Sequence, residues 1–126
     1  MKKRQRSRSA LLPGNVKHRL TTELPARVAL ISLDTDWLDM EHIGEIQMMG
    51  LLWAIMSDEA VGSEILSRVA AIIDRQKQEG RLYALEEEVK WLRDTLPPII
   101  DAITTAPNHA VEAAIEQAQR LLASAG

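Results

Sequence analysis

The residues best suited to chemistry gather near position 40, where two carboxylates flank a histidine. Asp39 and His42 are three residues apart, as are His42 and Glu45, so on a helix the three side chains form one row. Such a row could hold a divalent metal ion or orient His42 as a base. Helical di-iron proteins, however, need two Glu-x-x-His pairs and two further carboxylates, whereas this chain has one approximate pair. We therefore interpret the row as a solvated helix start whose acids complement the helix dipole.

Other catalytic sets are incomplete in this sequence. The chain has no cysteine, which excludes disulfides, thiolate nucleophiles and every cysteine-based metal centre. His18 and His109 have no serine or carboxylate at a motif spacing, and no nucleophile elbow, phosphate-binding glycine loop or H-E-x-x-H is present. We predict that the protein is not an enzyme and has no catalytic residue, cofactor or metal.

Charge is distributed unevenly along the chain. Residues 1–27 hold eight basic side chains and one acid, a net of +7, whereas residues 28–126 hold seven basic residues and seventeen acids, a net of −10. Residues 1–20 are rich in Lys, Arg and Ser and lack apolar periodicity, so we predict a flexible basic arm there, followed by a helical domain over residues 21–126. This asymmetry is typical of a protein that binds partners.

The basic arm supports an alternative function, nucleic-acid binding. Its cations could contact phosphates, although it has no aromatic residue to stack on bases and no predicted helix has a basic face. A solubilising tail and a docking strip for an acidic partner are equally consistent with its composition. The residues that would contact phosphates are Lys2, Lys3, Arg4, Arg6 and Arg8.

Apolar residues recur every three or four positions, which predicts an all-α fold. With no Phe, one Tyr and three Trp, the core must be aliphatic, as suits helix packing. The period and the breakers predict a compact bundle of four to five helices over about residues 22–34, 38–57, 64–78, 84–104 and 109–123. In the first helix Leu24, Val28 and Ile31 make a short apolar face, to which Leu33 can also belong. Pro97 and Pro98 predict a kink or break in the fourth helix.

Two further patterns bear on packing. A heptad stripe either forms one packing seam of the bundle or pairs with a second subunit, which would make a homodimer. Its members are Leu82, Leu85, Val89, Leu92, Leu96, Ile99 and Ile103. The second predicted helix is apolar almost all round, which indicates a central or interface position, and its Gly44 and Gly50 would let another backbone approach closely.

Five residues are candidates for contact with a partner protein. Met48 and Met49 are either core filler or part of an adaptable surface, and Trp37 and Trp91 are either interface anchors or lie across a neighbouring helix. The predicted partner-binding set is Trp37, Met48, Met49, Leu52 and Trp91. We therefore predict a small regulatory or adaptor protein that binds another protein, for example a transcription factor, through helical surfaces.

The sequence also predicts a cytoplasmic location. Its longest uncharged apolar stretch, residues 48–56, is far shorter than the roughly 20 residues of a membrane-spanning helix. Leu11 and Leu12 are followed at once by Pro13 and Gly14, so the basic start does not continue into the apolar region of a secretory signal.

Overall fold

Five α-helices and one π-helical turn make up the part of the protein that the computed structural model describes, residues 19–125. The predicted all-α fold is confirmed, and no strand is present in this part. In chain order the elements are η1 (Arg19–Glu23), α3 (Leu24–Ser32), α4 (Met40–Met56), α5 (Glu59–Glu79), α6 (Glu86–Thr105) and α7 (Asn108–Ala125).

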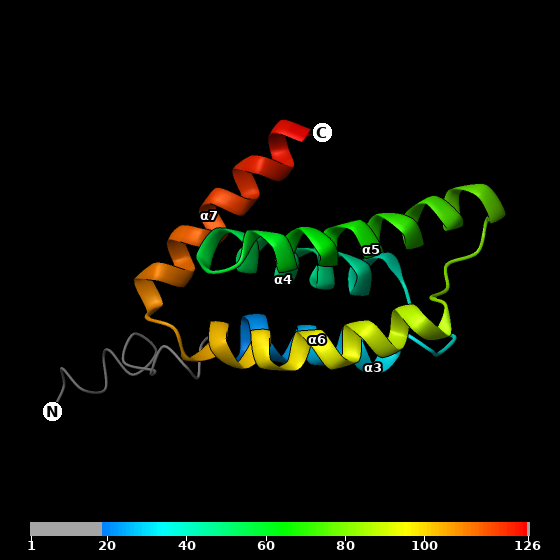
Figure 1. Ribbon diagram of the computed structural model, residues 1–126, viewed down its shortest axis with the longest axis horizontal. Helices are drawn as coiled ribbons and strands as arrows, with labels where there is room; N and C mark the ends of the chain where they lie inside the picture. The colour runs from blue at the N-terminus through cyan, green and yellow to red at the C-terminus, as the bar shows by residue number, and fades with distance from the viewer. Residues whose placement is uncertain (1–18, 126) are drawn as a thin grey trace, which may run out of the picture.

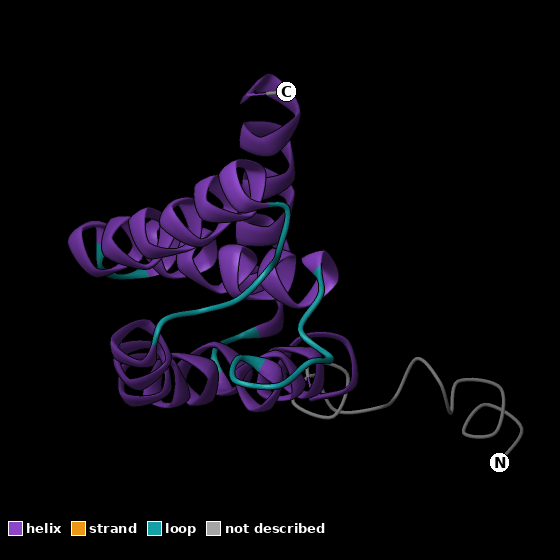
Figure 2. Ribbon diagram, turned by 90° about the vertical axis from the view of Figure 1, so that its right-hand side faces the viewer, coloured by secondary structure: helices purple, strands orange, loops and turns teal. Residues whose placement is uncertain are grey.

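The helices form two layers with a projecting terminal helix. Figures 1 and 2 show α4 and α5 side by side in one layer and α3 and α6 in the other, while α7 crosses one end and extends away from the body. The central element is α4, which contacts α3, α5, α6 and α7. Its residues Ile43, Ile46, Met49 and Leu52 are at most 1% exposed. The nearly all-round apolar character of α4 thus matches its place in the middle of the bundle.

The start of α5 differs from the prediction. The helix begins at Glu59, because the side chain of Asp58 accepts a hydrogen bond from the backbone N–H of Val61 and so caps it. Gly62 therefore lies inside the helix, and the predicted start at residue 64 was wrong. The end is as the sequence indicates, because Gly80 has a φ of 72° and closes the helix in the left-handed region.

Gly62 lies where α4 and α5 cross closely. A methyl group placed on Gly62 would lie 2.6 Å from both the Cβ of Ala54 and the carbonyl oxygen of Gly50. One on Gly50 would lie 2.9 Å from the Cγ2 of Ile65. Hydrogen is therefore the only side chain that fits at Gly62. Gly50 serves the role predicted for it, whereas no part of residues 19–125 lies within 4 Å of a methyl group placed on Gly44.

Helix α6 is continuous through Pro97 and Pro98, so the break that the sequence analysis offered beside a kink does not occur. The two prolines cannot donate to the carbonyl oxygens of Arg93 and Asp94, but packing holds the helix together. Leu96, Ile99, Ile100 and Ile103 follow or adjoin the prolines and are at most 4% exposed. Their burial outweighs the two missing backbone hydrogen bonds.

Five of the seven residues of the heptad stripe form an internal packing seam, whereas Leu82 and Leu85 lie in the segment before α6, where Leu85 is 39% exposed. Val89, Leu92, Leu96, Ile99 and Ile103 are between 0% and 8% exposed and belong to the hydrophobic core. A second subunit cannot reach these side chains while the bundle is folded, so the alternative of pairing through this stripe is not supported.

Replacing the exposed Pro98 by alanine should stabilise the protein by about 1 kcal/mol. The new N–H can donate to the carbonyl of Asp94, which removes part of the ~3 kcal/mol that an interior proline costs a helix. The gain is smaller than this cost because the strain at the proline is relieved only in part. In addition, losing proline increases the conformational entropy of the unfolded chain, which favours unfolding by about 0.4–1 kcal/mol. Urea unfolding of Pro98→Ala against the parent chain measures the difference. Equal or lower stability would show that α6 already accommodates the proline at no cost.

Candidate functional site

Asp39 and His42 of the predicted row form the N-terminal cap of α4, and Glu45 lies one turn further along the helix. A carboxylate oxygen of Asp39 accepts from the backbone N–H of His42 at 3.0 Å, and the backbone N–H of Asp39 donates to Nδ1 of His42 at 3.1 Å. This reciprocal capping box uses Nδ1 of His42 and one carboxylate oxygen of Asp39 to satisfy backbone N–H groups at the start of the helix. Within residues 19–125 no group of three or more His, Asp or Glu side chains is arranged to hold a metal ion.

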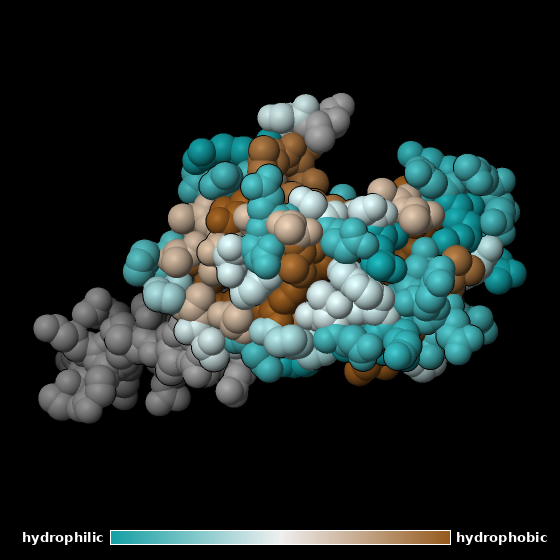
Figure 3. Space-filling view, viewed as in Figure 1, coloured by the Kyte–Doolittle hydropathy of each residue, from teal (hydrophilic) through white to brown (hydrophobic). Residues whose placement is uncertain are grey.

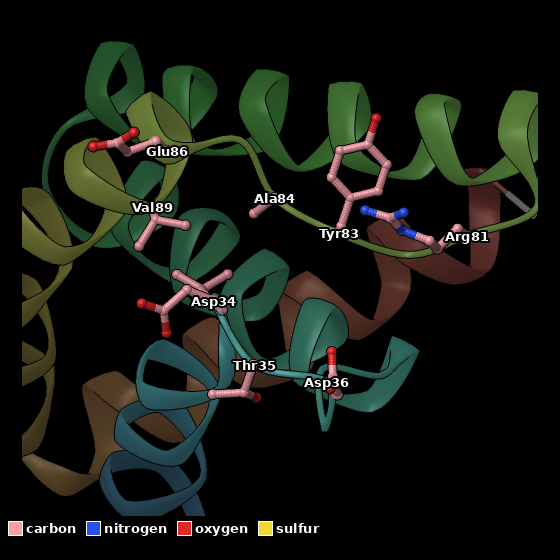
Figure 4. A pocket seen from close by; sticks show the side chains of 9 residues that line it. Asp34, Thr35, Asp36, Arg81, Tyr83, Ala84, Glu86 and Val89 are labelled. Carbon is pink, nitrogen blue, oxygen red and sulfur yellow. The ribbon is translucent and has the colours of Figure 1, made fainter.

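A hollow of about 360 Å³ lies between the α3–α4 turn and the segment that joins α5 to α6. Figure 4 shows its labelled side chains spread along the wall instead of converging on one point. Asp34 is held by Arg93 through two hydrogen bonds of 3.1 and 2.8 Å, which lower the pKa of its carboxyl. Arg81 lies 4.4 Å from the centre of the Tyr83 ring. The phenol of Tyr83 donates to Glu79 at 2.9 Å, which raises the pKa of Tyr83. These polar side chains are therefore already engaged in hydrogen bonds or ring contacts within the protein.

The five predicted partner-binding residues are dispersed. Met49 and Leu52 are 1% and 0% exposed, so they belong to the core and cannot contact a partner of the folded protein. Met48 is half-buried, and Trp91 is half-buried with the guanidinium of Arg68 4.2 Å from its ring centre. Trp37 is 78% exposed in the turn between α3 and α4. Of these five residues, only Trp37 is exposed enough to insert into the surface of a partner protein.

The apolar face predicted for the first helix lies on the outer side of α3, an exposure that the sequence did not indicate. Leu24, Val28 and Ile31 are 54%, 45% and 67% exposed, and their spacing of four and three residues places them in line along the helix. The opposite side, with Ala26, Ala29 and Leu30, packs into the core. We call Leu24, Val28 and Ile31 the α3 stripe. The predicted apolar face of this helix thus points outwards.

A groove, which we call the α3–α4 groove, runs along α4, with α3 as its other wall in one half and η1 and Ile115 of α7 in the other half. It consists of two adjoining hollows of about 300 and 230 Å³ that share Glu45. The first is lined by Leu24, Pro25, Val28, Glu41, His42 and Glu45. The second is lined by Thr21, Thr22, Gly44, Glu45, Met48, Met49, Leu52 and Ile115. The groove therefore combines an apolar floor with carboxylates, and one wall belongs to the α3 stripe.

The carboxylates of the groove repel each other. Burial raises the pKa of Glu45, and the charge of Glu41 one turn earlier raises it further. Neither residue forms an ion pair with Lys or Arg within residues 19–125. Asp34, by contrast, is neutralised by Arg93. The groove is thus a place where added positive charge would be stabilising.

A second exposed apolar region lies on α7. Leu121 and Leu122 are 48% and 37% exposed near its end. Figure 3 shows apolar colour on this projecting helix, continuing down the face between the two layers. Only these two large side chains are exposed on α7, against three on the much shorter α3.

Comparison of the chain with protein-family models, curated proteins and solved structures found no match. Among the helices of residues 19–125, none has the length and apolar character needed to cross a membrane. The predicted phosphate-contacting residues, Lys2, Lys3, Arg4, Arg6 and Arg8, lie outside the described residues, as does His18. Geometry and charge alone therefore have to support any assignment of function.

Proposed function

We propose that this protein is a small non-catalytic regulatory or adaptor protein that binds an amphipathic helix of a partner protein on the α3 stripe. The observation that carries the proposal is the concentration of exposed apolar side chains. Of the eight large hydrophobic residues exposed in the described part of the chain, five fall between Leu24 and Met40. Contiguous exposed apolar surface of this kind commonly marks an interaction site.

The α3 stripe is held in a fixed position. Arg93 donates to the carbonyl oxygens of Leu30 and Ile31 at 3.0 Å each and also binds Asp34. At the other end Arg27 bridges Glu23 and Asp101. These contacts tie both ends of α3 to its neighbours, so little conformational freedom is lost when a partner binds.

Spacing and charge define the kind of partner. Anchors at i, i+4 and i+7 suit helix-on-helix recognition, in which the two apolar faces pack together. Residues 19–125 hold nine basic and eighteen acidic side chains, a net of −9, and Glu41 and Glu45 lie beside the stripe. A helix with an apolar face and basic flanks complements this surface. Trp37 and Met40, 78% and 49% exposed, follow α3 in the turn and at the first residue of α4.

Substituting Ile31 by glutamate should abolish partner binding without unfolding the protein. Ile31 is 67% exposed, so the charge costs little in the free protein but is buried unpaired in a complex. We expect at least a tenfold loss of affinity. Tagged full-length chains capture proteins from the source lysate, mass spectrometry identifies those lost with Ile31→Glu, and calorimetry with the purified candidate measures its affinity.

The matched control is Leu121→Glu, which places the same charge on an exposed leucine of α7. It should keep the partner that Ile31→Glu loses, and both variants should retain the helical circular dichroism of the parent chain. If Ile31→Glu binds the purified candidate as tightly as the parent chain, or if Leu121→Glu loses it instead, the α3 stripe is not the binding surface.

A further inference from the structure

We propose that residues 1–18 of this chain dock in the α3–α4 groove, with their cations beside Glu41 and Glu45. The apolar pair Leu11 and Leu12 would cover Leu24 and Val28, the apolar wall of the groove. The occupant is thus a segment of the same molecule. Three independent features of the described residues support this inference: the groove's shape, its charge and its position relative to the point where residues 1–18 join the fold.

The first feature is the open space above Gly44. A glycine inside a helix costs about 1 kcal/mol relative to alanine, and at Gly50 and Gly62 close packing of α4 against α5 explains the choice. Gly44 is exposed, and nothing lies within 4 Å of a methyl group placed there. Packing among the described residues therefore does not account for it. A glycine that lines a groove allows another backbone to approach closely, as a docked segment would.

The second feature is complementary charge. Glu41 and Glu45 have no Lys or Arg partner in residues 19–125, and their mutual repulsion is relieved by a cation between them. Residues 1–18 carry six Lys and Arg side chains and no acid. The same segment also contains the adjacent leucines Leu11 and Leu12, so it combines cations for the carboxylates with apolar side chains for the wall of the groove.

The third feature is the short tether. Residue 18 immediately precedes η1, whose Thr21 and Thr22 line one end of the groove. Ten residues separate Leu12 from Thr22 and span up to ~35 Å when extended, whereas the stretch of α4 from Glu41 to Met48 rises only ~10 Å. A tether of this length gives an effective concentration on the order of millimolar, so weak contacts suffice for docking.

Docking would also cover part of the α3 stripe. Leu24 and Val28 belong to both surfaces, so the docked segment hides two of the three anchors from a partner helix. This autoinhibitory consequence rests on the proposed function. Docking itself does not, and it can be tested in the isolated protein without any partner.

Paramagnetic relaxation in the full-length chain tests the proposal. Because the chain has no cysteine, Ser9→Cys supplies a single attachment site for a nitroxide spin label. We expect the amide signals of residues 41–48 to lose most of their intensity, while those of residues 70–79 at the far end of α5 do not. Raising the salt to ~1 M, where charges are screened within about 3 Å, should restore the lost signals.

Two variants make the test specific. Glu41→Lys/Glu45→Lys reverses the groove's charge and should restore the signals, whereas Asp74→Lys/Asp94→Lys makes the same change in net charge at two exposed acids outside the groove and should not. Gly44→Leu fills the groove without changing the charge and should also restore them. Gly44→Leu therefore provides the test of docking if the double lysine variant does not fold.

Three results would overturn the proposal. The first is an absence of broadening at residues 41–48 in the labelled parent chain. The second is broadening that persists in both groove variants. The third is broadening found only when the label and the isotope are on different molecules, since the groove would then hold the segment of a second copy. None of these results bears on the Ile31→Glu comparison, so the two proposals can fail separately.

Discussion

Gly62→Ala should lower the free energy of unfolding by about 2 kcal/mol. The added methyl group would meet the carbonyl oxygen of Gly50 at 2.6 Å and the backbone nitrogen of Ala54 at 2.7 Å. Backbone atoms of α4 cannot move aside as a flexible side chain would, so the two helices must separate. Overpacking of this kind costs about 1–3 kcal/mol, and here the upper end is expected, less the ~1 kcal/mol that alanine gains over glycine in a helix.

Gly44→Ala is the matched control for this prediction. It makes the same chemical change in the neighbouring helix at a position where no described residue meets the added methyl group, so it should raise stability by up to about 1 kcal/mol, less any stability that docking of residues 1–18 contributes. Chemical denaturation of the two variants and the parent chain therefore gives changes of opposite sign. A Gly62→Ala protein as stable as the parent would mean that α4 and α5 can pack with a wider spacing at no cost.

The fold class could be predicted from the sequence because helix periodicity and helix ends are encoded locally. Asp39 at the start of α4 and Gly80 after α5 are capping residues of ordinary types, and the structure uses both as caps. The five residues of the heptad stripe that lie within α6 could be predicted in the same way, since residues at this spacing share one face of a helix. Rules of this kind need no knowledge of the neighbouring helices.

The errors arose where packing overrides local preference. Pro97 and Pro98 break isolated helices, yet buried residues on both sides hold α6 intact. Gly62 also resembles a helix breaker in the sequence, but the crossing of α4 and α5 requires a residue without a side chain at that point. In both cases the deciding contacts come from elsewhere in the chain or from the opposite face of the helix.

The candidate site was harder to predict than the fold. The sequence of α3 is apolar on two sides, so its pattern does not show which side faces the core. The smaller side chains of Ala26 and Ala29 pack inwards and leave Ile31 outside, because α3 lies close to its neighbours. In α4 the same ambiguity placed Met49 and Leu52 on the predicted partner surface, although both are buried. Side-chain type alone does not separate a core from an interface.

An ion pair between α5 and α6 also could not be predicted from the sequence, because its partners are thirteen residues apart and lie on different helices. The guanidinium of Arg75 binds both carboxylate oxygens of Glu88, at 2.9 and 2.8 Å, and also donates to the carbonyl of Tyr83 at 3.0 Å. Glu88 in turn accepts from the backbone N–H of Leu85 at 2.7 Å. The pair thus fixes the segment that connects the two helices to both of them.

Arg75→Met should destabilise the protein by about 3–5 kcal/mol. The change leaves the carboxylate of Glu88, whose side chain is only 7% exposed, without its counter-charge, and a buried unpaired charge is costly. In the double variant Arg75→Met/Glu88→Met no charge remains to be desolvated, so much of the loss should be recovered. Urea unfolding of the two single variants and the double variant measures the coupling. Additive losses would show that the pair contributes nothing beyond its separate side chains.

Acid should weaken the parent chain through the same pair. Burial alone would raise the pKa of Glu88, but the hydrogen bonds from Arg75 and from Leu85 outweigh it and lower the pKa in the folded protein. The unfolded chain then binds a proton more readily, so the contribution of Glu88 is complete above its unfolded pKa of about 4.3 and is lost as the pH falls through the folded value. Arg93 lowers the pKa of Asp34 as well, so some acid sensitivity must remain when Glu88 is replaced. Stability curves between pH 7 and 3 should therefore fall less steeply for Arg75→Met/Glu88→Met than for the parent chain, and parallel curves would contradict the assignment.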